Sequence, residues 1–473
     1  MKRIICLTMM VTLLTVGFVF ASAIELPRTG QTICYDTSGN VISCTGTGQD
    51  GEIQAGVAWP EPRFTDNGDD TMTDNLTGLM WKKDANLPGG TTDWQSDLDY
   101  ANSLTLAGYS DWRLPNVNEL ESLYNANEAN SATWLNAQGI TNVQADGYHW
   151  SSTTVASSPD LAWIVHMWSG GVHYDPKSVY HFVWPVRGGQ CGSLDHSVIC
   201  LPKTGQTKCY NTSGSVISCT GTGQDGEIQA GVARPDPGFT DHGDGTITDN
   251  LTGLMWTKNA NLPPGGTTNW QQALGYANNL TLAGYSDWRL PNRKELHSLQ
   301  DFSRYSPALP ASHPFTNVQG PYYWSSTNVA KYTDYAWVVS MWDGYVGNGY
   351  KSYYYCVWPV RSGSFGPTVI NLSSFTAIPK AGRVVIEWVT ESEIDNAGFN
   401  LYRAESENGE YVKVNESLIP TEGSVTQGET YQYIDENVKN RRTYYYKLED
   451  IDLNGTSTMH GPVSAEPRRL GRD

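Results

Sequence analysis

An internal duplication constrains this chain more than any other feature of its sequence. The stretch TLAGYSDWRLPN stands at residues 105–116 and returns without a change at residues 281–292. The segment LPRTGQTICYDTSGNVISCTGTGQDGEIQAGVA begins at Leu26, and a nearly identical segment begins at Leu201. Near the other end, VWPVRGG in the first copy matches VWPVRSG in the second. A unit of this length is large enough to fold as a domain, unlike a short solenoid repeat.

These matches set the domain boundaries that we expect. The first copy occupies residues 24–190 and the second residues 201–364, with a linker at 191–200. Residues 365–473 share no repeat with either copy and form a third domain. A chain of 473 residues exceeds what one hydrophobic core usually organises, which agrees with this division.

The first 23 residues have the layout of a cleavable secretory signal. Lys2 and Arg3 precede an apolar run from Ile4 to Phe20, and Ala21-Ser22-Ala23 follows. We therefore expect a mature chain that begins near Ile24 and is exported to the periplasm, the cell surface or the medium. No later stretch is apolar enough to cross a bilayer, so we expect no membrane insertion of the mature chain.

Export places the remaining cysteines in a compartment that permits disulfides. The same ten-residue interval separates Cys34 from Cys44 and Cys209 from Cys219, which predicts one disulfide in each copy. Proximity suggests a third pair, Cys191 with Cys200. Cys356 is left over in a strand-like stretch, where a buried inert thiol is expected.

Each copy is predicted to be an α+β domain. Residues 93–104 place apolar side chains at helical spacing, and residues 116–124 form a second, shorter helix capped by Asn116. From Tyr148 onward the sequence changes to short aromatic and β-branched runs separated by glycines, which predicts a curled antiparallel sheet.

The repeated segment TLAGYSDWRLPN is predicted to hold the fold together. Trp112 and Leu114 would enter the core, Pro115 would end the extended segment, and Arg113 would pair with Glu119. A structural role is therefore favoured over a functional one for this segment.

Residues 365–473 alternate apolar and polar side chains in runs separated by turns, as in GRVVIEWVT and RTYYYKLEDID. This pattern predicts an all-β sandwich. With Trp388 and the run Tyr444 to Tyr446, the segment resembles a fibronectin type III module.

Within each copy, the order of a helix, WRLPN, an EL-containing helix, YWSS and a closing WPVR resembles the Lcl C-terminal domain family. The resemblance covers nearly the whole of both copies and implies a fold similar to C-type lectins. The fold class we expect is thus two tandem C-type-lectin-like α+β domains followed by a fibronectin type III-like sandwich. The family also implies extracellular ligand binding, with glycosaminoglycan adhesion described for its namesake. This chain lacks the namesake's collagen-like stalk.

The charge of the chain excludes some partners. A formal net charge of −18 argues against nucleic acid and anionic membrane surfaces, and makes a strongly sulfated glycan less suitable. The chain holds 17 Trp and 27 Tyr, and aromatic side chains are both ordinary core material and common in recognition surfaces. An extracellular glycan or a surface protein is the expected partner.

Catalysis is not expected. The fold implied by the family is shared with formylglycine-generating enzymes, but the only cysteines common to both copies are those of the expected disulfides, so that chemistry has no nucleophile. None of the histidines is shared by the two copies. The first copy carries four histidines in its predicted strands, which could bind a metal, although no ligand spacing supports this: His149, His166, His173 and His181.

Calcium is the one cofactor that the sequence raises. Each copy has closely spaced carboxylates, namely Asp66, Asp69 and Asp74 in the first and Asp241, Asp244 and Asp249 in the second. Asp-Gly steps between strands are also what a tight hairpin turn requires, and we favour the turn. The motifs by which sugar-binding C-type lectins hold calcium are absent, and no other cofactor is expected.

The positions that differ between the copies indicate where a ligand would bind. From Trp163 to Trp184 shared and differing residues tend to alternate, which predicts a shared core face and a variable outer face. The second copy is rich there in Tyr, Asn, Asp and Gly, residues that binding loops favour. We therefore predict two recognition patches, at residues 169–181 and 343–355, whose ligand-binding residues are Ser169, His173, Tyr174, Asp175, Lys177, His181, Asp343, Tyr345, Asn348, Tyr350, Lys351, Tyr353 and Tyr355. Neutral drift on an exposed hairpin is the alternative explanation.

Together these observations predict an exported, non-enzymatic protein that binds a glycan or a protein at the bacterial cell surface. The alternative is a structural component of the cell envelope that assembles through its repeats. A formylglycine-generating type of enzyme is a remote third reading.

Overall fold

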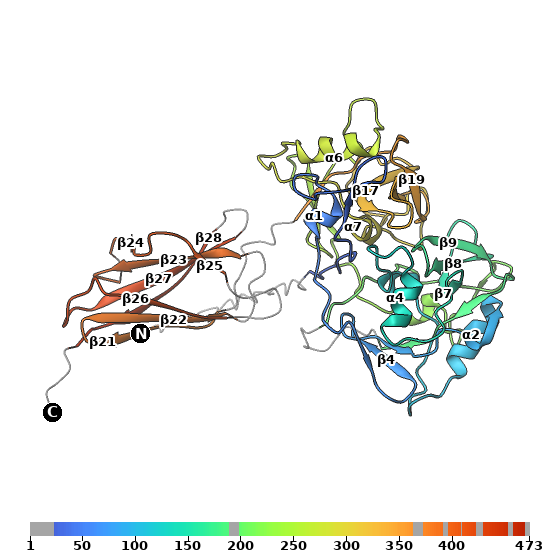
Figure 1. Ribbon diagram of the computed structural model, residues 1–473, viewed down its shortest axis with the longest axis horizontal. Helices are drawn as coiled ribbons and strands as arrows, with labels where there is room; N and C mark the ends of the chain where they lie inside the picture. Colours follow the sequence, from blue (N-terminus) through green and yellow to red (C-terminus); the bar gives the residue numbers. More distant parts are fainter. Residues whose placement is uncertain are drawn as a thin grey trace, which may run out of the picture.

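The computed structural model describes residues 23–188, 198–362, 372–390, 396–407, 409–421, 429–452 and 457–468 (Figure 1). The expected signal segment, residues 1–23, lies outside these ranges except for its last residue. Among the described residues, no helix is both long and apolar enough to span a bilayer.

Up to the sheet that ends each of them, the two copies have the same element order except for a strand at residues 87–92 and a helix at residues 131–137, which occur in the first copy alone among the described residues. The first copy contains β1 (Cys34–Tyr35), β2 (Val41–Ile42), α1 (Asp50–Ile53), β3 (Phe64–Asp66), β4 (Thr71–Asp74), β5 (Met80–Lys82), β6 (Leu87–Thr92), α2 (Trp94–Ser103), α3 (Val117–Ser122), α4 (Ser131–Ala137), β7 (Tyr148–Thr154), β8 (Leu161–His166), β9 (Val172–Pro176), β10 (His181–Val183) and β11 (Val186–Arg187).

The second copy contains β12 (Cys209–Tyr210), β13 (Val216–Ile217), α5 (Asp225–Ile228), β14 (Phe239–Asp241), β15 (Thr246–Asp249), β16 (Met255–Thr257), α6 (Trp270–Asn278), α7 (Arg293–Ser298), β17 (Tyr322–Asn328), β18 (Tyr335–Ser340), β19 (Val346–Tyr350) and β20 (Val360–Arg361). Its described residues show no helix at the place that α4 takes in the first copy. The predicted mixture of early helices and late strands is therefore confirmed in both copies.

The repeated segment around DWRLPN holds the core as predicted. Trp112 is 2% exposed and Leu114 is fully buried. Asn116 caps α3 in a capping box with Glu119, and the Arg113 guanidinium donates to both carboxylate oxygens of Glu119 at 2.7 and 2.5 Å. The second copy repeats this arrangement with Arg289 and Glu295. The identical letters of the two segments thus reflect one structural requirement.

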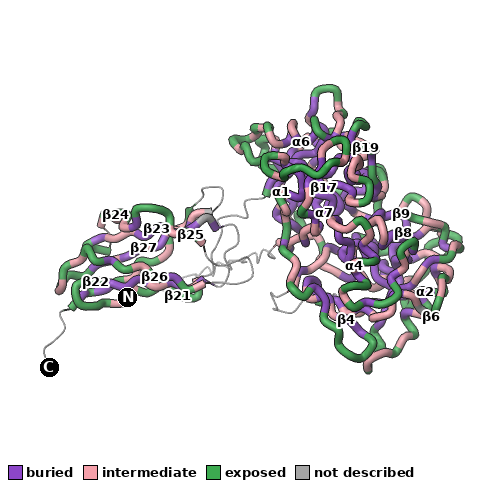
Figure 2. Tube along the Cα trace, viewed as in Figure 1, coloured by how far each residue is buried: buried purple, intermediate pink, exposed green. Residues whose placement is uncertain are grey.

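One eight-stranded sheet runs through both copies, in the order β17-β18-β19-β9-β8-β7-β10-β6. The two halves meet where β9 and β19 pair in an antiparallel manner, with Val172 opposite Val346. A single hydrophobic core continues across this junction: Trp163 of the first copy packs edge-on against Phe302, and Tyr124 packs against Trp337. Figure 2 shows buried segments throughout the region of β8, β17, α4 and α7.

The N-terminal segment of each copy packs on the other copy. We call residues 24–57 the first arm and residues 199–232 the second arm. Asp50 of the first arm accepts hydrogen bonds from Thr29 of its own copy at 2.6 Å and from Thr327 of the second copy at 2.7 Å. Asp225 of the second arm does the same with Thr204 at 2.6 Å and Thr153 at 2.8 Å.

Further contacts fix both arms in these crossed positions. The side chain of Gln31 exchanges hydrogen bonds with the backbone of Asn328, at 2.9 and 2.7 Å. The side chain of Gln206 does so with Thr154, at 2.8 and 2.5 Å. Because each arm satisfies buried polar groups of the opposite copy, the two copies form one interlocked unit across the predicted domain boundaries.

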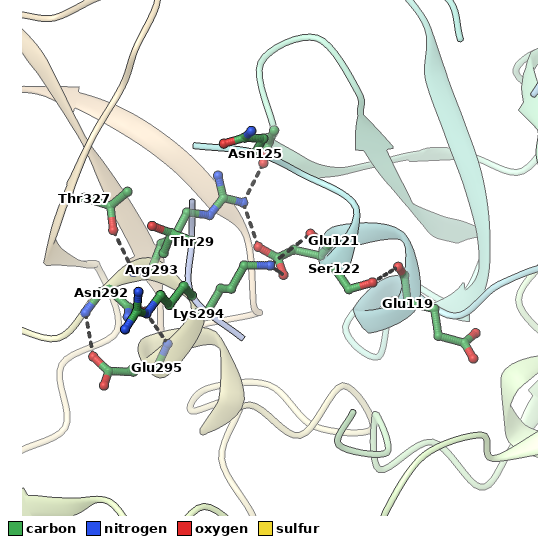
Figure 3. Close-up of polar contacts among 12 residues, drawn as sticks. Thr29, Glu119, Glu121, Ser122, Asn125, Asn292, Arg293, Lys294, Glu295 and Thr327 are labelled. Atoms are coloured by element: carbon green, nitrogen blue, oxygen red, sulfur yellow. Dashed lines mark hydrogen bonds and ion pairs between the residues drawn. The ribbon is translucent and has the colours of Figure 1, made fainter. Parts of the chain in front are cut away.

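Helices α3 and α7 carry the charged contact between the copies (Figure 3). The carboxylate of Glu121 in α3 lies 3.2 Å from Arg293 and 3.0 Å from Lys294, both in α7. Arg293 also donates to the carbonyl of Gly170 at 2.6 Å and lies over the ring of Trp337. All three charged side chains are buried, so this network is part of the core rather than of the surface.

The C-terminal segment forms the predicted β-sandwich. Its strands are β21 (Leu372–Lys380), β22 (Arg383–Thr390), β23 (Asn396–Ala404), β24 (Val412–Lys413), β25 (Ile419–Pro420), β26 (Thr430–Asp435), β27 (Tyr444–Asp452) and β28 (Ser457–Ala465). One sheet has the order β21-β22-β26 and the other β24-β23-β27-β28, with β25 beside β23. Between the sheets, Trp388 stacks on Tyr431 and packs against Phe399.

The disulfides Cys34–Cys44 and Cys209–Cys219 are both present, as predicted. Each closes the small hairpin of an arm. Cys200 is also disulfide-bonded, whereas its expected partner Cys191 lies outside the described residues. Cys356 is free and buried, as predicted, and burial raises the pKa of its thiol to about 11.

Candidate functional site

The pairing of β9 with β19 brings the two predicted patches together. Because the strands are antiparallel around Val172 and Val346, the residues that follow and precede them lie side by side. The rings of His173 and Tyr345 are 4.7 Å apart, and those of Tyr174 and Tyr345 are 6.4 Å apart. Two patches that the sequence separates by more than 160 residues therefore form one surface.

On the first-copy side, histidines surround Tyr148. The ring centroids of His166, His181 and His173 lie 4.4, 5.5 and 5.8 Å from that of Tyr148. His166 contacts the hydroxyl of Ser169 at 2.6 Å, and His181 contacts the carboxylate of Asp175 at 3.0 Å. This half of the surface combines aromatic rings with hydrogen-bonding groups.

Burial disfavours the charged form of these imidazoles. Burial lowers the pKa of His166 to about 4, and it lowers the pKa values of His173 and His181 as well, although Asp175 opposes the shift at His181. His166 and His181, the latter predicted to bind ligand, are only 8% exposed and lie beneath the surface, whereas His173 is half-buried. His149 is fully buried and contacts the carbonyl of Ala85 at 3.3 Å. In the described part of the chain, no three His, Cys, Asp or Glu side chains are placed to hold a metal ion.

On the second-copy side, tyrosines continue the surface. Ring contacts lead from Tyr345 to Tyr322 at 6.2 Å, from Tyr322 to Tyr355 at 5.5 Å, and onward through Tyr353 to Tyr350 at 6.4 and 5.3 Å. We call the complete set the aromatic face; its members are Tyr148, His166, His173, His181, Tyr322, Tyr345, Tyr350, Tyr353 and Tyr355.

Of two further predicted residues, Asp343 supports the turn before β19 and Asn348 lies within that strand. The Asp343 carboxylate accepts from the Ser340 hydroxyl at 2.8 Å and from the Tyr345 backbone N–H at 3.1 Å, which holds Tyr345 directly before the first residue of β19. Asn348 is exposed on β19. Asp343 therefore positions the aromatic face, whereas Asn348, which pairs with Trp337 as Tyr174 pairs with Trp163, lies on the other side of the sheet.

A polar basin lies at the second-copy end of the aromatic face. It has a volume of about 360 Å³ and is lined by Thr37, Asn269, Gln271, Asp334, Tyr350, Lys351 and Ser352. Thr37 belongs to the first arm, so the basin exists only where the arm of one copy meets the other copy. Tyr350, whose ring is tilted against that of Tyr335 at a centroid distance of 3.9 Å, supplies its aromatic wall.

The structure corrects the prediction for the two lysines. Lys177 and Lys351 are each 1% exposed and do not reach the surface. The Lys351 ammonium donates to the carbonyls of Asp36 and Thr333 at 2.9 and 2.8 Å and lies over the ring of Trp270. Lys177 lies over Trp94 and contacts the carbonyl of Asn211 at 3.4 Å. Both lysines hold an arm, which explains why they are shared by the copies.

The predicted division of β9 into a shared and a variable face also needs correction. His173 pairs with Ile164, whereas Tyr174 pairs with Trp163 and packs edge-on against it at 5.3 Å. Side chains of neighbouring residues alternate, so His173 and Tyr174 point to opposite sides of the sheet even though both differ between copies. Positions that differ between the copies therefore lie on both faces of β9, and such differences do not mark a single ligand-binding face.

The calcium candidates are engaged in turns and ion pairs. In the turn between β3 and β4, the Gly68 N–H donates to Asp66, which also pairs with Lys83 at 2.6 Å. In the second copy, Asp241 accepts from Gly243 and pairs with Lys258 in the same way. Asp69 and Asp244 accept from the threonine two residues later. Asp74 pairs with Arg63 at 2.7 Å, and Asp249 pairs with Arg234. The hairpin turn favoured from the sequence is confirmed.

Some residues at this surface could not be identified from the sequence. Lys331 of the second copy lies 3.3 Å from the ring of Trp168 in the first copy, and Trp168 packs against His166. Asn269 and Gln271 reach the basin from the start of α6. No motif marks these residues, because only the crossed packing of the copies brings them to the site.

The family model of the Lcl C-terminal domain matches residues 70–187 and 245–361. The chain contains two tandem Lcl C-terminal domains. The match to each Lcl domain begins after the arm, so the arms lie outside the matched segments. The aromatic face is built almost entirely within them, with strands β7 to β10 from the first Lcl domain and β17 to β19 from the second.

Other comparisons are more distant. An 89-residue stretch is 26% identical to the amylopullulanase of Thermoanaerobacter thermohydrosulfuricus; it spans 19% of this chain and only 5% of that enzyme. Among solved structures, an Fn3-like protein from Clostridium thermocellum is 15% identical over 21% of this chain and 95% of its own, with a TM-score of 0.16. The β-1,2-glucanase of Parabacteroides distasonis is 14% identical over 28% of this chain and 18% of its own, with a TM-score of 0.18. None of these likenesses bears on the function of the Lcl domains.

Proposed function

We propose that this protein is exported, is not an enzyme, and binds a glycan or a protein at the bacterial cell surface through the aromatic face. In this proposal each Lcl domain has a C-type-lectin-like fold. The observation that carries the proposal is the continuity of the face: rings from both copies are in contact from Tyr148 to Tyr350.

The chemistry of the face favours a glycan. Aromatic rings offer flat apolar surfaces against which the C–H groups of a sugar ring can pack, and a phenol adds a hydrogen-bonding group at its edge. In the basin, Asn269, Gln271 and Asp334 provide amide and carboxylate groups beside Tyr350. Rigid aromatic contacts surrounded by adaptable polar groups are typical of recognition surfaces.

Two observations support export and a non-enzymatic role. The disulfides Cys34–Cys44 and Cys209–Cys219 suit an oxidising compartment. On the aromatic face, His181 with Asp175 is an imidazole–carboxylate pair, and the second copy has Tyr355 and Gly349 at these positions. The pair occurs in the first copy only and therefore does not support a catalytic mechanism shared by both copies.

The test is a glycan-array screen of the mature chain, residues 24–473, beside a Tyr345→Ala/Tyr353→Ala variant. Tyr305→Ala serves as the matched control, since Tyr305 is about as exposed as Tyr353, at 52% and 51%, and belongs to no part of the face. We expect glycans that bind the parent and the control and lose most of their signal with the double variant.

Equal binding by the parent and the double variant would show that the glycan binds outside the aromatic face. Silence of every glycan with the parent would refute glycan recognition and leave a protein partner or a structural role in the envelope. Circular dichroism of all three proteins checks that the substitutions leave the fold intact.

A further inference from the structure

Cation–π contacts of the two copies recur at equivalent places. The copies meet at Val172 and Val346, which occupy equivalent positions, so a pseudo-two-fold axis at this pair relates the two halves of the unit. A contact made by one copy is therefore expected at the equivalent place in the other. Two such pairs of contacts are Lys177 over Trp94 with Lys351 over Trp270, and Arg187 over Tyr109 with Arg361 over Tyr285.

One cation–π contact between the copies has no counterpart. The Lys331 ammonium of the second copy lies 3.3 Å from the ring centroid of Trp168 in the first copy. The imidazole of His166 packs edge-on against the same tryptophan at 5.5 Å. Aligning VASSPDLAW with VAKYTDYAW puts Ser157 at the place of Lys331. The first copy therefore has no cation with which to make the equivalent contact.

The equivalent tryptophan of the second copy, Trp342, has neither of these partners. Aligning VHMWSG with VSMWDG puts Trp342 at the place of Trp168 and Ser340 at the place of His166. The Trp342 side chain is 49% exposed, and no cation and no second aromatic ring contacts it in the described part of the chain. Comparison with Trp168 indicates that a cationic group fits the open face of Trp342.

The physical basis for this comparison is the charge distribution of the indole. Single exposed apolar side chains are ordinary on protein surfaces, so exposure alone would not mark a site. The face of a tryptophan ring attracts a cation, however, and the position that Lys331 takes over Trp168 uses this attraction. Tryptophan and arginine are also the residues that often dominate the binding energy of protein interfaces.

An unpaired cation lies on the same surface as Trp342. The backbone N–H of Ser306 donates to the Trp342 carbonyl at 2.6 Å, so the exposed residues 303–306 run beside Trp342. Arg304 belongs to this segment. Its guanidinium makes no hydrogen bond, ion pair or cation–π contact within the described residues. The surface therefore carries both an open aromatic ring and a cation that could cover one.

This combination is self-complementary. Arg304 does not cover Trp342 of its own chain, but across a two-fold axis Arg304 of each chain can contact Trp342 of the other. The first copy cannot offer the same surface. Aligning EANS with SRYS puts Ala129 at the place of Arg304, and Trp168 is already covered within the chain. Each chain thus has one such surface, so association through it closes at two molecules.

We propose that two molecules form a symmetric dimer in which Arg304 of each chain lies over Trp342 of the other, as Lys331 lies over Trp168 within the chain. The dimer goes beyond the proposed function, because this contact uses no residue of the aromatic face. It would present two aromatic faces on one particle and so raise the avidity for a ligand with repeated binding sites. Each chain carries a formal net charge of −18, and salt is needed to screen the resulting repulsion.

The test is sedimentation equilibrium of the mature chain, residues 24–473, over a series of concentrations at physiological ionic strength. Trp342→Ala removes the ring, and Arg304→Ala introduces the residue of the first copy. Ser157→Lys supplies the missing cation from within the chain and should cover Trp342 without removing it. Arg383→Ala is the matched control, since Arg383 is an exposed arginine of the C-terminal sandwich.

We expect a monomer–dimer equilibrium for the parent and the control, and dimerisation about tenfold weaker for each of the three variants. An equimolar mixture of Trp342→Ala and Arg304→Ala can form a dimer with one intact contact, so it should associate more strongly than either variant alone. A parent that stays monomeric throughout the series would overturn the proposal. Undiminished dimerisation of Trp342→Ala or Ser157→Lys would do so as well, and a mixture no stronger than its components would exclude the pairing of Arg304 with Trp342.

Discussion

Replacing Glu121 with glutamine should destabilise the interlocked unit more than any single surface change. The Glu121 carboxylate pairs with both Arg293 and Lys294, and all three side chains are at most 6% exposed. Glutamine has nearly the same shape, so the substitution removes the charge and leaves the packing in place. Two buried cations would then face each other without an anion between them (Figure 3).

The expected cost follows from the burial of the network. Removing one partner of a buried ion pair typically costs about 3–5 kcal/mol, because the remaining charge stays desolvated and uncompensated. At about 2 °C per kcal/mol for a unit of this size, the melting temperature should fall by about 6–10 °C. The attraction of Lys294 and Arg293 lowers the pKa of Glu121 against the effect of burial, so the pair persists at mildly acidic pH.

The assay is differential scanning calorimetry of the mature chain, in which the transition of the two Lcl domains is followed. Glu128→Gln is the matched control, since Glu128 lies in the same copy and takes part in no ion pair of the described residues. In a double-mutant cycle, Lys294→Met should recover part of the loss when added to Glu121→Gln. A shift for Glu121→Gln no larger than that of Glu128→Gln would refute the reasoning.

Three further predictions concern the same unit. Lys351→Met should lower the free energy of unfolding in urea by about 1–3 kcal/mol, because it leaves two carbonyls without a donor. Lys177→Met should lower it by less, since the Lys177 ammonium has one carbonyl contact at 3.4 Å. Equal losses for the two variants would contradict this. Burial lowers the pKa of His149 to about 3. The neutral imidazole therefore contributes stability that is fully present above about pH 6.5 and is lost as the pH falls. The substitution His149→Tyr, which introduces the residue of the second copy, should make the free energy of unfolding less dependent on pH in the acid range. Burial raises the pKa of Asp50 and Asp225 to about 6, so their contribution to stability has the opposite pH dependence and is lost as the pH rises through 6. An acid limb that the His149→Tyr substitution leaves unchanged would exclude His149 as its source. Finally, residues 24–188 and 198–362 produced separately should combine into a 1:1 complex in light scattering after size exclusion, and a stable monomer of either piece would show that the crossed arms are dispensable.

The local elements could be predicted from the sequence because their determinants are local. Asn116 and Glu119 stand three residues apart and form a capping box wherever the helix begins, and the Cys34–Cys44 interval fixes a disulfide within a hairpin. The alternation of the C-terminal strands likewise needs no knowledge of partners. These features were therefore predictable to within a residue or two.

The site could be predicted only in part, because its geometry depends on which copy each segment contacts. Lys177 and Lys351 read as surface lysines in polar loops, yet each is buried under an arm that comes from the other copy. Tyr345 and His173 were both predicted, but as members of separate patches. Their contact depends on the pairing at Val172 and Val346, which no local pattern specifies.

Differences between the copies at α3 and α7 explain why they pair with each other. The positions of Asn118 and Glu121 in the first copy are those of Lys294 and His297 in the second. All four residues line one small cavity between the copies. If two second copies packed on each other in this arrangement, Lys294 would face His297 and the cations would have no acidic partner. If two first copies did so, Glu121 would face Asn118 and would have no cationic partner. Burial of an uncompensated charge disfavours both arrangements. The charge pattern therefore selects the mixed pair, and with it the single arrangement in which the aromatic face is assembled from unlike halves.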